Sequence, residues 1–252
     1  MKNNNKFRLD VWGAITLGTI ALYALFLLYP MAYLIRQSVL DPDTGSFTLA
    51  YFTKFFSKSY YFDTLINSFK VSITATVLSI AIGTPLAYLF TIFKIKGKSV
   101  LNILIVVASM SAPFIGAYSW ILLLGRSGII TTFFKNLGIA IPDIYGFGGI
   151  VLVMTLQLFP LVFLYAKGAL KNIDNSLIEA AENLGCSGIA CFFKVVVPLI
   201  MPPLLAAALL VFMRSFADFG TPMLIGEGYR TFPVVLYTEF INEVGGSDGF
   251  AA

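Results

Sequence analysis

The chain has 252 residues, of which 58% are hydrophobic and only 12% are charged, and its mean hydropathy is +0.86. Soluble domains carry charge on about 25% of their residues, so this composition excludes an ordinary soluble fold. The apolar residues form continuous blocks of about 20 residues, which suits helices that cross a bilayer and not the alternating pattern of a membrane β-barrel. We therefore predict an all-α fold, a polytopic bundle of membrane-spanning helices.

The formal net charge is +4. In a membrane protein such a charge reflects topology, so no nucleic-acid partner is expected. The chain has no histidine, and its two cysteines, Cys186 and Cys191, have a spacing that fits neither a redox motif nor a zinc site. We expect free thiols, no metal site, no bound cofactor and no catalytic residue, so the chain is not expected to be an enzyme.

Five apolar blocks predict five spans. They cover about 12–37, 64–92, 99–124, 149–167 and 195–217, and no sixth block follows. The first block follows a basic stretch, but it is too long for a signal peptide and lacks a small-residue cleavage site, so we interpret it as an uncleaved span. Pro85, Pro113 and Pro160 predict kinks in the second, third and fourth spans, either for packing or to open a pathway.

The distribution of Lys and Arg predicts the orientation. Nine of the 17 basic residues lie in the N-terminal tail with Lys2, Lys6 and Arg8, the turn with Lys94, Lys96 and Lys98, and the loop from Lys167 to Lys194. Because such segments stay inside the cell, the N-terminus is predicted to be cytoplasmic. The C-terminal region then lies outside, where residues 231–243 predict a short amphipathic helix at the surface or an ordered loop.

The loop between the fourth and fifth blocks predicts two short helices around a turn. Ser176 and Glu179 have the spacing of a capping box, so the first helix is expected to begin there and to end at Gly185. The second is expected to start near Ser187 or Gly188 and to lead into the fifth span, with Pro198 near the membrane entry. An apolar stripe on the first helix fits a groove on a partner, the membrane or the neighbouring spans, and it consists of Leu177, Ile178, Ala181 and Leu184.

The segment EAAENLGCSGIACFFKVVVP, residues 179–198, resembles the EAA signature of permease subunits of type I ATP-binding-cassette importers, which share the MetI-like fold. The matching positions are Glu179, Ala180, Ala181, Gly185, Val195, Val197 and Pro198. In that family the loop is a coupling helix that inserts into a cleft on the ATPase subunit. The resemblance implies three kinds of protein partner: an ATPase, expected as a dimer, a second permease half or subunit, and an external substrate-binding protein. It also implies residence in the inner (plasma) membrane.

Local chemistry offers a second interpretation of the same residues. Glu179 fits a capping box, Ala180 and Ala181 are ordinary helix formers, and Gly185 is an ordinary helix stop. The chain has no GxxxxGK[ST] motif to hold ATP, so ATP is expected on the partner subunit.

Arg214 and Asp218 are four residues apart near the outer end of the fifth span, where both are expected to lie on one helix face. Ionisable groups at membrane depth usually face a cavity or pair with each other, so both are candidates for the translocation pathway. An ion pair or snorkelling to the interface explains them equally.

The segment SFADFGTPMLIG, residues 215–226, resembles permeases of the ferric-iron branch of the family, and aminoethylphosphonate permeases look similar. Sulfate and molybdate permeases tend to have GEFG where this chain has ADFG, which favours iron. Many such iron permeases are two fused halves, so we expect the chain to be the first part of a longer permease. The alternative class is an ion-coupled secondary transporter, but such proteins need midplane ion sites or inverted repeats, and neither is evident.

Overall fold

The computed structural model of the chain describes residues 11–41, 45–93, 96–110, 112–139, 141–186 and 188–241. Within these ranges every named element is helical, and the one β contact is an isolated bridge between Leu40 and Phe47. The all-α prediction is therefore confirmed. The described part of the chain divides into two compact units, one with the described residues of 11–62 and 236–241 and one with those of 63–235.

The first unit contains a continuous helical segment, Val11–Val39, which consists of α1 (Val11–Tyr23), the π-helical turn η1 (Ala24–Leu28) and α2 (Tyr29–Val39). None of its residues is buried. The short helix α3 (Ala50–Ser57) follows. At the edge of this unit the Tyr61 hydroxyl donates a hydrogen bond of 3.0 Å to Oε1 of Glu239.

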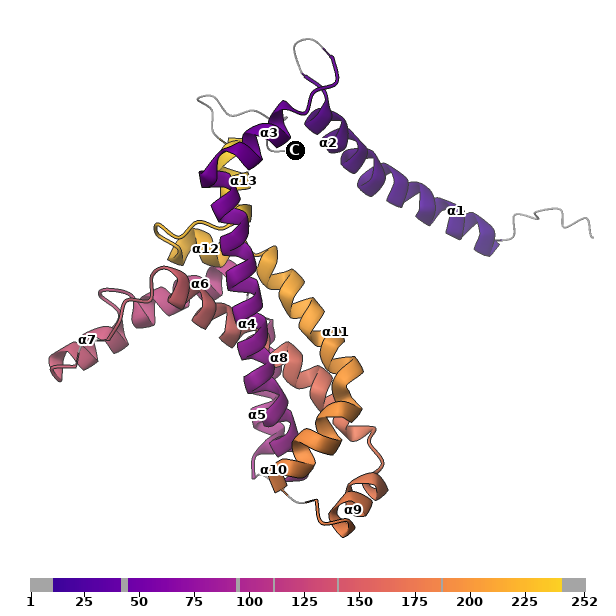
Figure 1. The fold of residues 1–252 in the computed structure, drawn as a ribbon, viewed down its shortest axis with the longest axis vertical. Coiled ribbons are helices and arrows are strands. Elements are labelled where there is room, and N and C mark those ends of the chain that lie inside the picture. Colours follow the sequence, from indigo (N-terminus) through magenta and orange to yellow (C-terminus); the bar gives the residue numbers. More distant parts are fainter. Residues whose placement is uncertain are drawn as a thin grey trace, which may run out of the picture. The chain divides into compact units, whose positions relative to one another are not determined.

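The second unit contains most of the long helix α4 (Ser59–Ile92) and the remaining elements (Figure 1). These are α5 (Lys98–Ser109), α6 (Pro113–Leu124), α7 (Ile129–Asn136), α8 (Phe147–Lys171), α9 (Asn175–Asn183), α10 (Gly188–Cys191), the π-helical turn η2 (Phe192–Val196), α11 (Val197–Phe216), α12 (Gly220–Ile225) and the start of α13 (Phe232–Ile241). In this unit α9 and α10 lie at one end of α8 and α11, and α12 lies toward the other end.

Two apolar clusters form the core of the second unit. The larger joins residues of α4, α6, α8, α11 and α12, and among its fully buried side chains are Ile150, Met154, Val211 and Ile225. The smaller joins α4, α8, η2 and α11 around Phe163, whose ring meets that of Phe90 edge-on at 5.2 Å. The second cluster therefore fixes the start of the fifth span against α4 and α8.

Five helical segments of the described chain are long and apolar enough to cross a membrane: Val11–Val39, Ser59–Ile92, Phe114–Asn136, Phe147–Lys171 and Phe192–Phe216. The third of them is not one helix, because the turn at 125–128 separates α6 from α7. Four of them match predicted spans to within a few residues. The predicted third span, residues 99–124, is wrong as a single helix, because α5 ends at Ser109 and α6 begins at Pro113. Proline disfavours a helical conformation in the residue before it, and Ala112 is extended, with φ −68° and ψ 141°.

Pro85 and Pro160 lie inside continuous helices, α4 and α8. Of the predicted segment 231–243, residues 232–241 form α13, which favours the helical alternative, while Asn242 and Glu243 lie outside the described residues. The basic residues Lys2, Lys6, Arg8 and Lys94 also lie outside them.

Both π-helical turns come directly before a helix whose second residue is proline. The segment Ala24–Leu28 precedes Pro30, and Phe192–Val196 precedes Pro198. A proline has no N–H to donate, and its ring collides with the carbonyl group four residues earlier. The wider turn accommodates this ring, and the N–H of Val197 donates to the carbonyl of Phe192, five residues back.

The helices α4 and α8 approach each other closely at Gly83, and we predict that a methyl group there destabilises the fold. A Cβ atom on Gly83 would lie 2.9 Å from the carbonyl oxygen of Phe159 and 2.9 Å from Cβ of Val162. Overpacking of this kind costs about 1–3 kcal/mol, so Gly83→Ala should lower the melting temperature of the purified protein in detergent by several degrees.

Gly168→Ala is the matched control, because this glycine lies in α8 with nothing within 4 Å of a Cβ atom. Alanine favours a helix there, so the control should melt at or slightly above the wild-type temperature. Equal melting of the two variants would show that α4 and α8 do not pack as described.

Candidate functional site

The loop between the fourth and fifth spans begins with a helix cap at Asp174. Its Oδ1 accepts a hydrogen bond of 3.0 Å from the N–H of Ser176, and its carbonyl accepts one of 3.1 Å from Leu177. The hydrogen bonds that the carboxylate accepts from Ser176, first from its backbone and then from its side chain, hold the pKa of the Asp174 carboxyl below its ordinary value. Asp174 is therefore the residue that caps α9 (Asn175–Asn183).

This cap corrects the predicted capping box between Ser176 and Glu179. In that motif the Glu179 carboxylate would accept a hydrogen bond from the N–H of Ser176, but this N–H donates to Asp174 instead. The Glu179 side chain is exposed, and within the described residues it has no hydrogen bond or ion pair. Asp174, and not Glu179, therefore accepts the hydrogen bond from the N–H of Ser176.

The end of α9 is a Schellman motif built on Gly185, as the sequence predicted. Gly185 has φ +85°, and the N–H of Cys186 reaches back to the carbonyl of Ala181 at 3.0 Å. A positive φ of this size disfavours any residue with a side chain, so glycine is required by the backbone. The caps at both ends make α9 a short helix with defined limits.

Several side chains of α9 are exposed. Leu177 is 49% exposed and Leu184 is 89% exposed, and Glu179 and Ala180 are exposed as well, with Glu179 on the helix face opposite Leu177. Ala181 is half-buried, and the side chain of Ile178 lies outside the described ones. The predicted stripe is therefore present at Leu177 and Leu184, and these two leucines are not covered by other described residues.

The other end of the loop connects directly to the fifth span. The elements α10, η2 and α11 follow one another without a break from Gly188 onward, as predicted, while Ser187 lies outside the described residues. Val195 is half-buried, Val197 packs against the smaller core cluster, and Pro198 is exposed in the first turn of α11. The EAA positions thus form a helix, a turn and the base of a span, with α9 in contact with α10 and η2.

The predicted pair of Arg214 and Asp218 is not on one helix face. The helix α11 ends at Phe216, so Asp218 lies beyond it, and no ion pair joins the two among the described residues. Instead Oδ2 of Asp218 accepts a hydrogen bond of 2.6 Å from the hydroxyl of Thr221, and Oδ1 accepts one of 2.9 Å from the N–H of Gly220. Burial raises the pKa of the Asp218 carboxyl, and these hydrogen bonds oppose the rise.

Arg214 is exposed in the last turn of α11. Asp218 therefore organises the start of α12, and its predicted place in a pathway stays a prediction.

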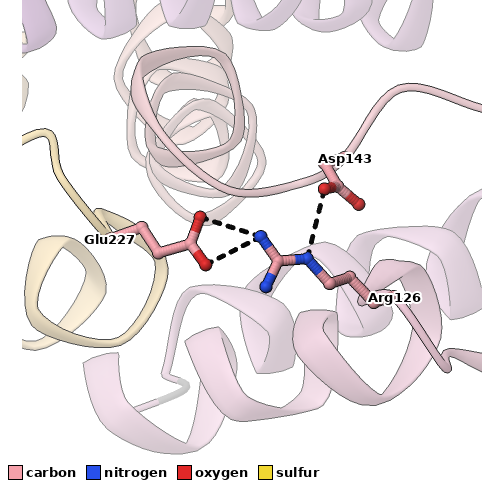
Figure 2. Close-up of polar contacts among 3 residues, drawn as sticks. All are labelled: Arg126, Asp143 and Glu227. Carbon is pink, nitrogen blue, oxygen red and sulfur yellow. Dashed lines mark hydrogen bonds and ion pairs between the residues drawn. The ribbon is translucent and has the colours of Figure 1, made fainter.

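A second charged group joins three loops at the far end of this unit (Figure 2). The Arg126 guanidinium contacts Oδ2 of Asp143 at 3.3 Å and Oε1 of Glu227 at 2.8 Å, and it lies 4.9 Å from the centre of the Tyr145 ring. All three charged side chains are at least half exposed. These residues lie in three separate loops, so no pattern in the sequence connects them.

The family of membrane components of binding-protein-dependent transport systems matches residues 47–246 of this chain. The chain belongs to this family. The match contains the whole loop with α9 and α10, so the resemblance stated from the EAA segment is confirmed. It also contains α4 to α13 of this permease, whereas the first helical segment lies before it.

Known relatives of the permease differ in what their names state. It is 28% identical to the putative ferric transport system permease protein FbpB 1 of Haemophilus influenzae over 86% of this chain and 34% of that protein. It is 29% identical to the spermidine/putrescine transport system permease protein PotB of the same species over 88% of this chain and 79% of that protein. The chain thus spans about a third of the ferric relative's length.

Among solved structures, a bacterial alginate ABC transporter in complex with a periplasmic protein contains a chain with the same fold. The TM-score is 0.78, the sequence identity is 16%, and the alignment covers 96% of this chain and 86% of that one.

We predict that Asp174 keeps the first turn of α9 folded. Asp174→Ala removes the acceptor for the Ser176 N–H, so amides of the first turn should exchange with deuterium faster. Folding lowers the pKa of the Asp174 carboxyl. The stability that the carboxylate gives to the first turn is therefore complete above about pH 4, and it is lost only as the pH falls through the folded pKa. The difference from the wild type, corrected for intrinsic exchange, should therefore be constant from about pH 5 to 8.

Asp174→Ser retains a capping oxygen and should exchange at nearly the wild-type rate. Wild-type exchange in the Asp174→Ala protein would show that α9 does not depend on this cap.

Proposed function

We propose that this chain is the membrane permease of an ATP-driven importer, and that α9 is its contact with a separate ATPase subunit. The observation that supports this most is the exposure of α9, both at the EAA residue Glu179 and at the apolar residues Leu177 and Leu184. Glu179 has no intramolecular partner among the described residues, and Leu177 and Leu184 present apolar surface that a cleft on another protein would bury.

The connection to the spans explains how such a contact would do work. The caps at Asp174 and Gly185 fix the length of α9, and the unbroken run from α10 to α11 joins it to the fifth span. The helix α11 in turn packs on α8 through Leu204, Ala207 and Val211 of the larger cluster. Movement of α9 by an ATPase would therefore move α8 and α11 as packed bodies, which is the rigid-body kind of switch that changes access across a membrane.

We propose ferric iron as the substrate, delivered by an external binding protein and passed through a pathway completed by a second permease half. The support is the resemblance of residues 215–226 to the ferric-iron branch and the similarity to ferric transport relatives. The second candidate is a polyamine, because the PotB relatives align over 79% to 86% of their own length. Arg214 and Asp218 remain proposed pathway residues in either case.

The coupling role predicts that changes in α9 uncouple uptake without removing the protein from the membrane. Gly185→Ala places a side chain at φ +85°, which costs about 1–2 kcal/mol, so the native end of α9 becomes about 5- to 30-fold less populated. Glu179→Lys reverses an exposed charge at the proposed contact. Both variants should insert at wild-type levels and lose most ATP-dependent uptake in membrane vesicles.

Matched controls are Gly168→Ala in α8 and Lys135→Glu on the exposed face of α7. Both should transport like the wild type. Full uptake by Gly185→Ala and Glu179→Lys would refute the coupling role of α9.

The proposed orientation predicts the side from which α9 is accessible. Leu184→Cys places a thiol at a position that is 89% exposed, in a background where Cys186 and Cys191 are replaced by serine. An impermeant maleimide should label this thiol in inside-out vesicles and not in intact spheroplasts. Labelling from outside the cell would overturn the proposed function.

The substrate proposal predicts a selective defect. Cells that lack the gene for this chain should lose uptake of radiolabelled ferric iron and keep uptake of radiolabelled spermidine, and the wild-type gene should restore the loss. The reverse pattern would contradict iron and support the polyamine candidate.

A further inference from the structure

Three lysines meet where the start of α5 lies beside the end of α8. Lys98 is the first residue of α5 and Lys171 the last of α8, and Lys167 lies one turn before Lys171. The Lys167 Nζ donates a hydrogen bond to Oδ1 of Asn102, one turn into α5. Residues four apart share a helix face, so Lys98 with Asn102 and Lys167 with Lys171 form two short polar rows.

These lysines have no acidic partner in the part of the chain that the structure describes. Lys98 and Lys171 both repel the Lys167 ammonium, which also lies 5.3 Å from the centre of the Phe163 ring. The acid nearest in sequence, Asp174, uses its carboxylate to cap α9. Lys98 and Lys167 are half-buried, so water screens their mutual repulsion less than at an open surface.

Charges are balanced differently at the opposite end of the same unit. There the Arg126 cation is matched by two carboxylates, Asp143 and Glu227. At the end with the lysines, three cations converge and no anion of the described chain balances them.

We propose that Lys98, Lys167 and Lys171, with Asn102, bind the phosphate group of an anionic phospholipid. Basic pockets between membrane helices on the cytoplasmic side suit such headgroups. Both helices that supply the lysines are apolar beyond this end, which places the cluster at headgroup depth. The residue before α5 is Gly97, which has no side chain to accept hydrogen bonds from the first turn. The backbone N–H groups of that turn, at the positive end of the helix dipole, can therefore donate to the phosphate. The assignment to the inner leaflet rests on the proposed orientation.

Binding of phosphatidylglycerol to the purified protein in neutral detergent tests this site, with native mass spectrometry as the readout. The wild type should retain phosphatidylglycerol in preference to phosphatidylcholine. Removing two cations by Lys98→Ala with Lys171→Ala should weaken this binding by about 30-fold, since each lysine near a lipid surface contributes about fivefold. Lys98→Arg with Lys171→Arg keeps both charges and should retain most of the affinity.

Lys135→Ala is the matched control for loss of a lysine, because this residue is exposed on α7 away from the cluster. It should bind phosphatidylglycerol like the wild type. Equal weakening by Lys135→Ala, or equal retention of the two lipids, would overturn the site, because either result means unspecific attraction. Displacement of the lipid by millimolar inorganic phosphate would also overturn it, since the ligand would then be free phosphate.

The measurement contains no ATPase and no transport step. A failure of lipid binding therefore leaves the proposed permease function standing, and a failure of coupled uptake leaves the lipid site standing.

Discussion

The packing of α8 against α4 and α11 is the constraint on which the rest of the second unit depends. Most of the fully buried large side chains belong to these helices, and Gly83 lets the backbones of α4 and α8 approach closely. Packed interiors respond to a displacement by moving together, since they have little empty volume to absorb it. The loop with α9 interrupts the chain between two of these helices, so a force applied to that loop acts on the core directly.

The parts of the structure that the sequence predicts correctly are those that local chemistry determines. The length of the apolar blocks predicts four of the spans. Gly185 predicts a helix end, because glycine adopts a positive φ without the steric penalty of a side chain. The EAA spacing identified the family, since it fixes several residue types within one loop. These signals lie within short stretches of sequence and do not depend on distant contacts.

The errors occurred where two local signals compete or where partners are far apart in the chain. Hydropathy alone joined α5 and α6 into one span, although Pro113 ends the helical conformation before it. The predicted cap at Ser176 is wrong, because the N–H of Ser176 is itself a donor to Asp174, the aspartate that caps α9. Arg126 and Glu227 are 101 residues apart, so no pattern in the sequence could have shown that they pair.

The π-helical turn at Phe192–Val196 has a consequence for the direction in which α9 faces. A turn of this type contains one residue more than an α-helical turn, and one residue corresponds to a rotation of about 100° around the axis. The direction in which α10 leaves the fifth span is therefore set by that single additional residue. A deletion within this pentapeptide would turn α10 to a different side of the fifth span, and it would also shorten the spacing between Gly185 and Pro198.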